Sequence, residues 1–123
     1  MSDVNALIGR FFAVCNEADP KRRQELIGET FRADATFVDP LFQASGEAEL
    51  DSLLAQILTM FPGHVTRQKG ETDAHHNVVR FSWEIVPDGD VAIAAGTDFG
   101  VIAPDGRFQS ITSFFDLVPA GMI

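Results

Sequence analysis

The sequence predicts an α+β protein in which three N-terminal helices pack on one face of a curved antiparallel sheet. Apolar residues keep a helical spacing as far as Phe61, and β-type residues take over from His64 onward. Two turn dipeptides, Asp88-Gly89 and Asp105-Gly106, divide the second half into hairpins. Helices followed by a meander of strands are typical of a sheet that helices cover on one side.

Length and charge bound the class of protein. The 123 residues predict a single domain, residues 1–123, with a core large enough to need no disulfide. The net charge of −9 repels nucleic acids and anionic membranes, so we expect neither as a partner. No apolar run is long enough to cross a bilayer and the N-terminus does not resemble a signal peptide, so we expect a cytoplasmic protein.

The first helix is predicted from Val4 onward, where apolar residues recur at the i, i+3, i+4 and i+7 positions. Its buried stripe contains Phe11 and Cys15. We interpret Cys15, the only cysteine, as a small buried hydrophobic residue rather than a catalytic thiol.

The second and third helices are bounded by cap and turn residues. Asp19-Pro20 starts a short helix that ends near Gly28, and its three basic residues are predicted to face solvent: Lys21, Arg22 and Arg23. Ser45-Gly46 precedes the third helix, whose apolar face includes Leu54 and Leu58 and which Pro62-Gly63 ends.

Between these helices, residues 34–42 read as an extended segment that places Asp39 directly before a proline. Proline keeps the preceding residue out of the helical region, so Asp39 sits on a stiff backbone among apolar neighbours. Burial there would raise its pKa and suit it to carry a proton. The alternative is that Asp39 only caps a turn, since Asp-Pro is common turn chemistry.

Strands are predicted near residues 64–72, 76–86, 91–103 and 107–118. The first is more polar, which places it near an edge of the sheet or leaves one of its faces open to water. Trp83 shares one face with Val79, Phe81 and Ile85, and Arg80 lies on the other. The sequence does not decide which face looks inward.

Asp98 lies between two glycines on an otherwise apolar strand. Gly96, Asp98 and Gly100 share one face by two-residue periodicity, and the missing side chains leave room for a pocket or a bend. Asp98 is therefore either a functional carboxyl or a buried partner of Arg80 or of a backbone amide.

We expect no metal and no cofactor. His75 and His76 are adjacent, so their rings should point to opposite faces of a strand and not bind one ion, and His64 is distant in sequence. No phosphate loop, dinucleotide fingerprint or nucleophile elbow occurs. His75 or His76 could assist a proton transfer, and the alternative is a structural role, which is commoner for a histidine at the start of a strand.

The order of elements, together with residues 10–19, 34–40 and 96–99, resembles the nuclear-transport-factor-2-like superfamily, and in particular its SnoaL-like and ketosteroid-isomerase-like branch. The resemblance covers nearly the whole chain. It implies a cone-shaped, cystatin-like fold.

The same resemblance implies catalytic roles. In ketosteroid isomerases the aspartate before the proline is the general base, a role that falls on Asp39. The strand aspartate that donates a hydrogen bond to the developing oxyanion corresponds to Asp98. The tyrosine that assists it corresponds to Phe11, which has no hydroxyl, so half of that oxyanion site is missing.

Two functions follow as hypotheses. The first is an enzyme that isomerises, cyclises, dehydrates or hydrates a small apolar ring compound, with Asp39 as base and Asp98 as acid or oxyanion donor. The second is a binding module for a small hydrophobic ligand. Both need a cavity between the helices and the concave face. Its expected substrate-binding residues are Phe11, Cys15, Leu54, Leu58, His75, Trp83 and Phe115.

The meander strands also carry more apolar residues than one helical layer can cover. Phe108 and Phe114 are expected on one face of the last strand, and Ile111 and Phe115 on the other. We therefore expect a homodimer through the outer face of the sheet, as is common in the superfamily that the chain resembles.

Overall fold

The helices and strands follow the predicted order, and the computed structural model describes residues 2–87 and 91–121. The helices are α1 (Ser2–Asn16), α2 (Pro20–Thr30) and α3 (Glu47–Met60). The strands are β1 (Phe31–Val38), β2 (Gln43–Ser45), β3 (His64–His75), β4 (Val78–Pro87), β5 (Ala94–Ile102) and β6 (Phe108–Leu117). The predicted turn at Asp88-Gly89 lies outside the described residues.

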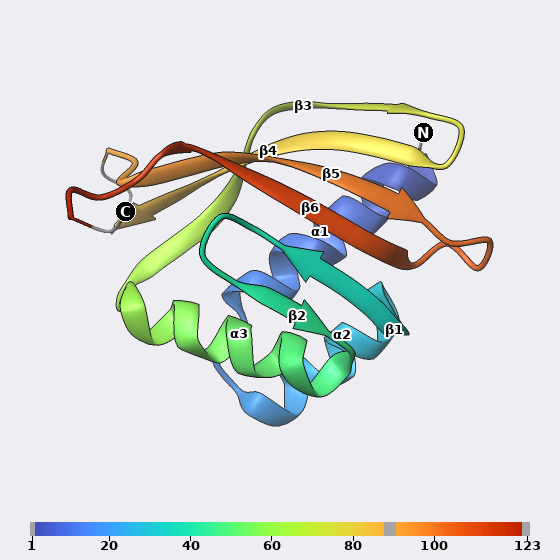
Figure 1. Ribbon diagram of the computed structural model, residues 1–123, viewed down its shortest axis with the longest axis horizontal. Helices are drawn as coiled ribbons and strands as arrows, with labels where there is room; N and C mark the ends of the chain where they lie inside the picture. Colours follow the sequence, from blue (N-terminus) through green and yellow to red (C-terminus); the bar gives the residue numbers. More distant parts are fainter. Residues whose placement is uncertain (1, 88–90, 122–123) are drawn as a thin grey trace.

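The described strands form one six-stranded sheet in the order β2-β1-β6-β5-β4-β3 (Figure 1). Strands β3, β4, β5 and β6 pair antiparallel with one another in sequence order, which confirms the predicted meander, and β3 lies at an edge. Strand β1 instead runs parallel to β6, so the sheet is mixed and the expectation of a purely antiparallel sheet is wrong at this pair. The α+β class with helices on a curved sheet is confirmed.

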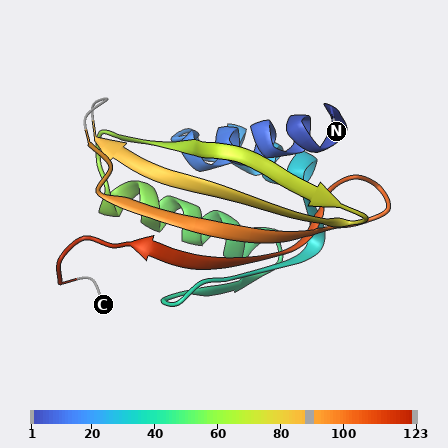
Figure 2. The same ribbon diagram turned by 90° about the horizontal axis from the view of Figure 1, so that it is seen from above.

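The three helices lie on one side of the sheet (Figure 2). Helix α1 packs against β3, and α3 packs against β1 and β2. Helix α2 begins at Pro20, as predicted, and the side chain of Asp19 accepts a hydrogen bond of 2.9 Å from the Arg22 N–H. None of the helices in residues 2–87 and 91–121 is long and apolar enough to cross a membrane.

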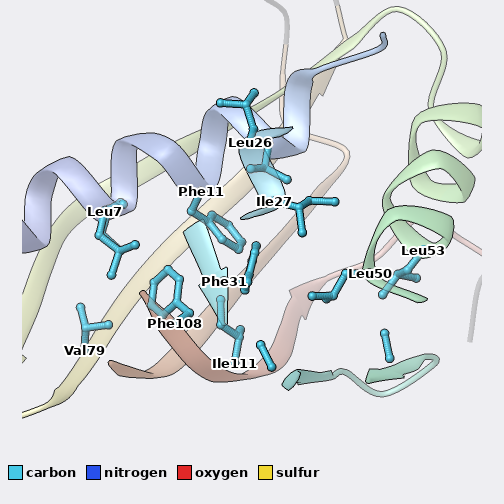
Figure 3. Packing of buried hydrophobic residues seen from close by; sticks show 14 of the residues in the cluster. Leu7, Phe11, Leu26, Ile27, Phe31, Leu50, Leu53, Val79, Phe108 and Ile111 are labelled. Atoms are coloured by element: carbon cyan, nitrogen blue, oxygen red, sulfur yellow. The ribbon is translucent and has the colours of Figure 1, made fainter. Parts of the chain in front are cut away.

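Phenylalanine rings fill the space between α1 and the sheet. The ring of Phe11 lies edge-on to Phe81, with 5.0 Å between ring centroids, and Phe81 stacks on Phe108 at 6.2 Å. Figure 3 shows Phe11, Phe31 and Phe108 gathered from α1, β1 and β6. Phe81 and Phe108 are fully buried, so these rings form a closed core between α1 and the sheet.

Strand β4 settles which of its faces looks inward. Val79, Phe81 and Ile85 are buried, whereas Arg80 is exposed and its guanidinium lies 2.8 Å from the Asp73 carboxylate. The face that carries Trp83 therefore looks toward the helices.

On β6 the strict two-residue alternation fails. Phe108 and Ile111 are both buried, although they were expected on opposite faces. The pairing with β5 shifts between Val101 and Ile102, and this irregularity turns Phe108 inward along with Ile111.

The burial of Arg23 also differs from the prediction. Arg23 was predicted to face solvent, but only 4% of it is exposed. Its Nε donates a 2.6 Å hydrogen bond to Asp51 of α3, and its Nη1 donates to the Glu17 carbonyl. The ion pair links α2 to α3 and to the end of α1, a tertiary arrangement that the charge pattern of α2 alone does not reveal.

The edge strand β3 is held by a side chain. Asn16, the last residue of α1, accepts a 2.8 Å hydrogen bond from the Thr66 N–H and donates one of 2.7 Å to the Thr66 carbonyl. The amide thus takes the place of a neighbouring strand at one residue of the edge and fixes α1 against β3.

Candidate functional site

A cavity of about 110 Å³ lies between α1, α3 and the sheet. Its walls are almost entirely apolar, and a carboxyl group enters from each of two elements, Asp39 from the turn after β1 and Asp98 from β5. The apolar lining residues are Phe11, Phe31, Phe37, Leu41, Phe42, Leu50, Leu53, Leu54, Ile57, Met60, Phe61, Ile85, Ala94, Phe115, Leu117 and Val118. The other lining residues are Cys15, Thr66, Trp83 and Ser113.

Asp39 caps its own turn and also lines the cavity. Its Oδ1 accepts hydrogen bonds from the backbone N–H groups of Leu41, at 2.8 Å, and Phe42, at 2.7 Å. Its own N–H donates to the Phe42 carbonyl at 2.9 Å, which closes the turn after Pro40. The turn-cap interpretation is therefore right about the local geometry, and the same geometry fixes the carboxyl at the cavity wall.

Asp98 is almost fully buried, with 1% of its surface exposed. Its Oδ1 accepts a 2.8 Å hydrogen bond from the indole N–H of Trp83, and the Ser113 hydroxyl donates to the same carboxyl group. The alternative that Asp98 pairs with Arg80 is wrong, because Arg80 lies on the outer face. The two donors come from the strands on either side of β5, so the sheet itself orients this carboxyl.

Glycines beside Asp98 make room for that arrangement. A Cβ atom at Gly96 would lie 2.4 Å from Cζ2 of Trp83 and 2.5 Å from the Phe114 carbonyl oxygen. Only a residue without a side chain lets the indole lie over β5 and reach Asp98.

Both carboxyls have raised pKa values, in the direction that the sequence predicts. Burial raises the pKa of Asp98 to about 6, against the lowering effect of the hydrogen bonds from Ser113 and Trp83, and the charge of Asp39 raises it further. Burial also raises the pKa of Asp39, against the lowering effect of the N–H groups of Leu41 and Phe42. The charge of Asp39 acts on Asp98, so the two titrations are linked.

Helix α1 contributes Phe11 and Cys15 to the cavity, one helical turn apart. Burial raises the pKa of the Cys15 thiol and the charge of Asp98 raises it further, so the thiol stays protonated. A protonated thiol is a poor nucleophile, in agreement with the interpretation of Cys15 as a packing residue. Phe11 presents a ring and no hydroxyl.

The structure brings together most of the predicted substrate-binding residues: Phe11, Cys15, Leu54, Trp83 and Phe115 line the cavity with both carboxyls. It does not bring Leu58 or His75 there. Leu58 is half-buried on α3 but is not part of the wall, and His75 is exposed at the far end of β3.

The prediction that the rings of His75 and His76 diverge is also wrong. Their Nδ1 atoms lie 3.0 Å apart, because His76 is in the turn after β3 with a φ of 52°. No group of three metal-ligating side chains occurs among the described residues, and we assign no metal or cofactor site.

Ser113 lines the cavity and donates to Asp98, and it was not predicted as a site residue. It lies two residues before Phe115 on β6 and so shares the inward face, and a polar residue in that position is a signal that periodicity carries. Thr66 was missed as well, since β3 reads as a polar edge strand.

No protein-family model matches the chain, and no curated protein matches it in sequence. A solved structure from Agrobacterium tumefaciens, provisionally described as an isomerase of the SnoaL-like family, is 29% identical with a TM-score of 0.89, over 94% of this chain and 99% of that chain.

Two more distant structures share the fold alone. A provisionally named SnoaL-like polyketide cyclase from Jannaschia sp. CCS1 is 14% identical with a TM-score of 0.74, over 94% of this chain and 86% of that chain. A protein of unknown function with a cystatin-like fold from Methylobium petroleophilum PM1 is 16% identical with a TM-score of 0.75, over 99% of this chain and 81% of that chain.

Proposed function

The chain belongs to the SnoaL-like group of the nuclear-transport-factor-2-like superfamily, and from this premise we propose that it is an enzyme that moves a proton on a small, apolar, ring-bearing molecule. One observation carries the proposal: Asp39 and Asp98 line the same apolar cavity. Isomerisation, cyclisation and dehydration of a ring compound all begin with a proton transfer at or next to a polarised group.

In this proposal Asp39 is the general base. Its Oδ1 is held by the turn, and its raised pKa makes it a stronger base than an exposed carboxylate. Asp98 in its protonated form donates a hydrogen bond to the oxygen on which negative charge develops. Trp83 and Ser113 hold the Asp98 carboxyl in place during that step.

A second candidate function is a binding module that catalyses no reaction. The absence of a hydroxyl on Phe11 favours it. The Phe11 ring stands where the resemblance to ketosteroid isomerases calls for a phenol, so a ketone oxygen would find fewer donors here. A binding protein needs only the apolar walls.

Deuterium exchange at the acidic C–H groups of β-tetralone, a two-ring ketone, tests the enzyme proposal by NMR. We expect Asp39→Asn to lower the rate roughly a hundredfold or more while the fold stays intact, because the base is lost in a nearly isosteric change. Asp98→Asn should have a milder effect, since an amide still donates. Asp34→Asn is the matched control, because Asp34 is exposed on β1, the strand before the Asp39 turn, and does not line the cavity.

The pH profile supplies a second check. The rate should rise with pH as Asp39 loses its proton and fall above about 6 as Asp98 loses its own. A wild-type rate no faster than buffer for β-tetralone and similar ring ketones, with Asp39→Asn unchanged, would leave the binding module.

We also propose that two chains pair through the outer face of the sheet. Phe99 and Phe114 lie on that face, 45% and 53% exposed, with ring centroids 5.8 Å apart. Covering these rings would remove a large apolar area from water. Sedimentation at micromolar concentration should give twice the 13.4 kDa chain mass, and Phe114→Glu should shift it toward the monomer. A wild-type monomer would contradict the proposal.

A further inference from the structure

The charges around the cavity all have one sign. The titratable side chains among its described lining residues are Asp39, Asp98 and Cys15, and no lysine, arginine or histidine lines it. His64, which follows closely on the lining residue Phe61, is kept neutral by burial, which lowers its pKa. At neutral pH the Cys15 thiol is neutral too, so the carboxylates alone set the charge of the cavity.

The two hydrogen-bond donors beside Asp98 are already engaged, and the other hydroxyl and the thiol on the described wall belong to Thr66 and Cys15. The indole N–H of Trp83 and the hydroxyl of Ser113 both donate to Asp98, and Phe11 has no hydroxyl. An anion or a developing oxyanion would have to compete for these donors and face two carboxyls. A ligand that brings its own N–H groups and a positive charge needs acceptors instead. The two backbone N–H groups that donate to the Asp39 carboxyl both end on Oδ1, not on Oδ2.

The walls suit a cation as well. Aromatic rings line the cavity from several elements, and Trp83 meets Phe115 edge-on with 6.1 Å between ring centroids. The faces of such rings attract an organic cation that has left water. Aromatic walls with carboxylates and no internal cation are complementary to an ammonium group on a hydrophobic body.

We propose that the natural ligand of this cavity is a lipophilic organic cation, a ring-bearing amine or iminium, held by Asp39 and Asp98. This inference rests on the proposed function of the site and specifies its substrate class. It differs from the ketone form of that function in the state of Asp98, which is ionised for a cation and protonated for a ketone. A ketone would find one donor fewer here than beside a phenol, because Phe11 has no hydroxyl.

An iminium substrate also removes the need for an oxyanion donor. Asp39 takes a proton from the carbon next to the C=N⁺ group, and the C–H electron pair becomes a C=C bond. The π pair of the C=N⁺ bond moves to nitrogen as its lone pair. The product is a neutral enamine, Asp39 is protonated, and no negative charge forms on the substrate. Ionised Asp98 stabilises the iminium before the transfer.

Three one-ring probes of similar size test the sign of the charge: phenethylamine, phenethyl alcohol and phenylacetate. Trp83 is the only tryptophan and the chain has no tyrosine, so its fluorescence reports on the cavity wall directly. At neutral pH we expect the amine to bind roughly tenfold more tightly than the alcohol, and phenylacetate to bind most weakly.

The pH dependence should differ between the probes. The amine should gain affinity as pH rises through about 6, where Asp98 ionises, and the alcohol should lose affinity over the same range. Asp39, the other titrating carboxyl of the cavity, acts in the same direction, while Cys15 stays neutral. This measurement uses the unaltered protein and needs no variant to fold.

Variants assign the effect to the two carboxyls. Asp98→Asn and Asp39→Asn should each lower the amine affinity about tenfold and leave or improve that of the alcohol. Asp34→Asn, which removes one negative charge from the same chain outside the cavity, should leave both unchanged.

Each outcome bears on the proposal. An amine that binds no more tightly than the alcohol, or that loses as much affinity in Asp34→Asn as in Asp98→Asn, overturns the cation inference and leaves the ketone enzyme standing. If none of the three probes changes the Trp83 fluorescence, the result contradicts both the cation inference and the proposal that the cavity binds small ring compounds. Preference for the amine in a protein that exchanges no protons supports a cation-binding module and overturns only the catalytic part.

Discussion

Strand β5 carries two glycines, and each lies against an aromatic ring. Gly100 lies beside the closed core, whereas Gly96 lies beside the cavity. A Cβ atom at Gly100 would lie 2.6 Å from Cε1 of Phe108, and one at Gly96 would lie 2.4 Å from Cζ2 of Trp83. In both places the missing side chain lets a ring from a neighbouring strand come close to the backbone of β5. The packing device is the same.

The surroundings of the two rings are different. Phe108 is enclosed by Phe11, Phe31 and Phe81 in the closed core. The indole of Trp83 lies at the wall of the open cavity, and its N–H donates to Asp98, which stands between the two glycines. The two regions differ in one polar pair. The indole N–H of Trp83 and the carboxyl of Asp98 form a hydrogen bond in the candidate site, and Phe108 has no such partner in the core.

Filling the two glycines separately should produce the largest effects. We expect Gly96→Ala to lower the free energy of unfolding by about 3 kcal/mol and Gly100→Ala by about 2 kcal/mol, since overpacking strains both places. The added methyl at Gly96 also meets the Phe114 carbonyl oxygen, which the β-ladder fixes, whereas at Gly100 it meets side chains. Urea denaturation of both variants measures the difference.

The two variants should also separate core from site. Gly96→Ala should displace the indole from Asp98, shift the fluorescence of Trp83 and lower proton exchange. Gly100→Ala should lose stability alone. Equal loss of exchange activity in both variants, at a temperature where both are folded, would break the comparison.

Much of the fold was predictable because its signals are local. The meander follows from short-range turn chemistry, and Asp105-Gly106 does form the turn between β5 and β6, with the Gly106 N–H donating to the Ala103 carbonyl at 2.9 Å. The parallel pair of β1 and β6 joins residues far apart in the chain, and no local turn sequence predicts such a pairing. Arg23 fails for the same reason, because its partner Asp51 lies on another helix.

The site was predictable in part. The proline rule predicted a stiff backbone at Asp39, and two-residue periodicity placed Asp98 on the face of Gly96 and Gly100. Periodicity fails only where the ladder is irregular, as at Phe108. The hydrogen bond from Trp83 to Asp98 depends on a register between β4 and β5 that a single sequence does not contain.

If Asp98 is what distinguishes the Gly96 end from the Gly100 end, neutralising it should make the cavity end behave more like core. The pKa of Asp98 is raised from 3.8 to about 6, so in the folded protein ionisation is disfavoured, and stability is lost as pH rises from about 4 through 6. A shift of this size corresponds to at most about 3 kcal/mol, from which any poorer hydrogen bonding of an amide is subtracted. We therefore expect Asp98→Asn to be about 1 to 3 kcal/mol more stable than wild type at neutral pH. Well below pH 4, where the carboxyl is protonated in the folded and the unfolded state, the variant should be no more stable than wild type. Denaturation curves across this pH range measure the difference, with Asp34→Asn as the control for net charge. A variant that is less stable than wild type at neutral pH would mean that Trp83 and Ser113 need a carboxylate, and that Asp98 is a structural anchor as much as Phe108 is.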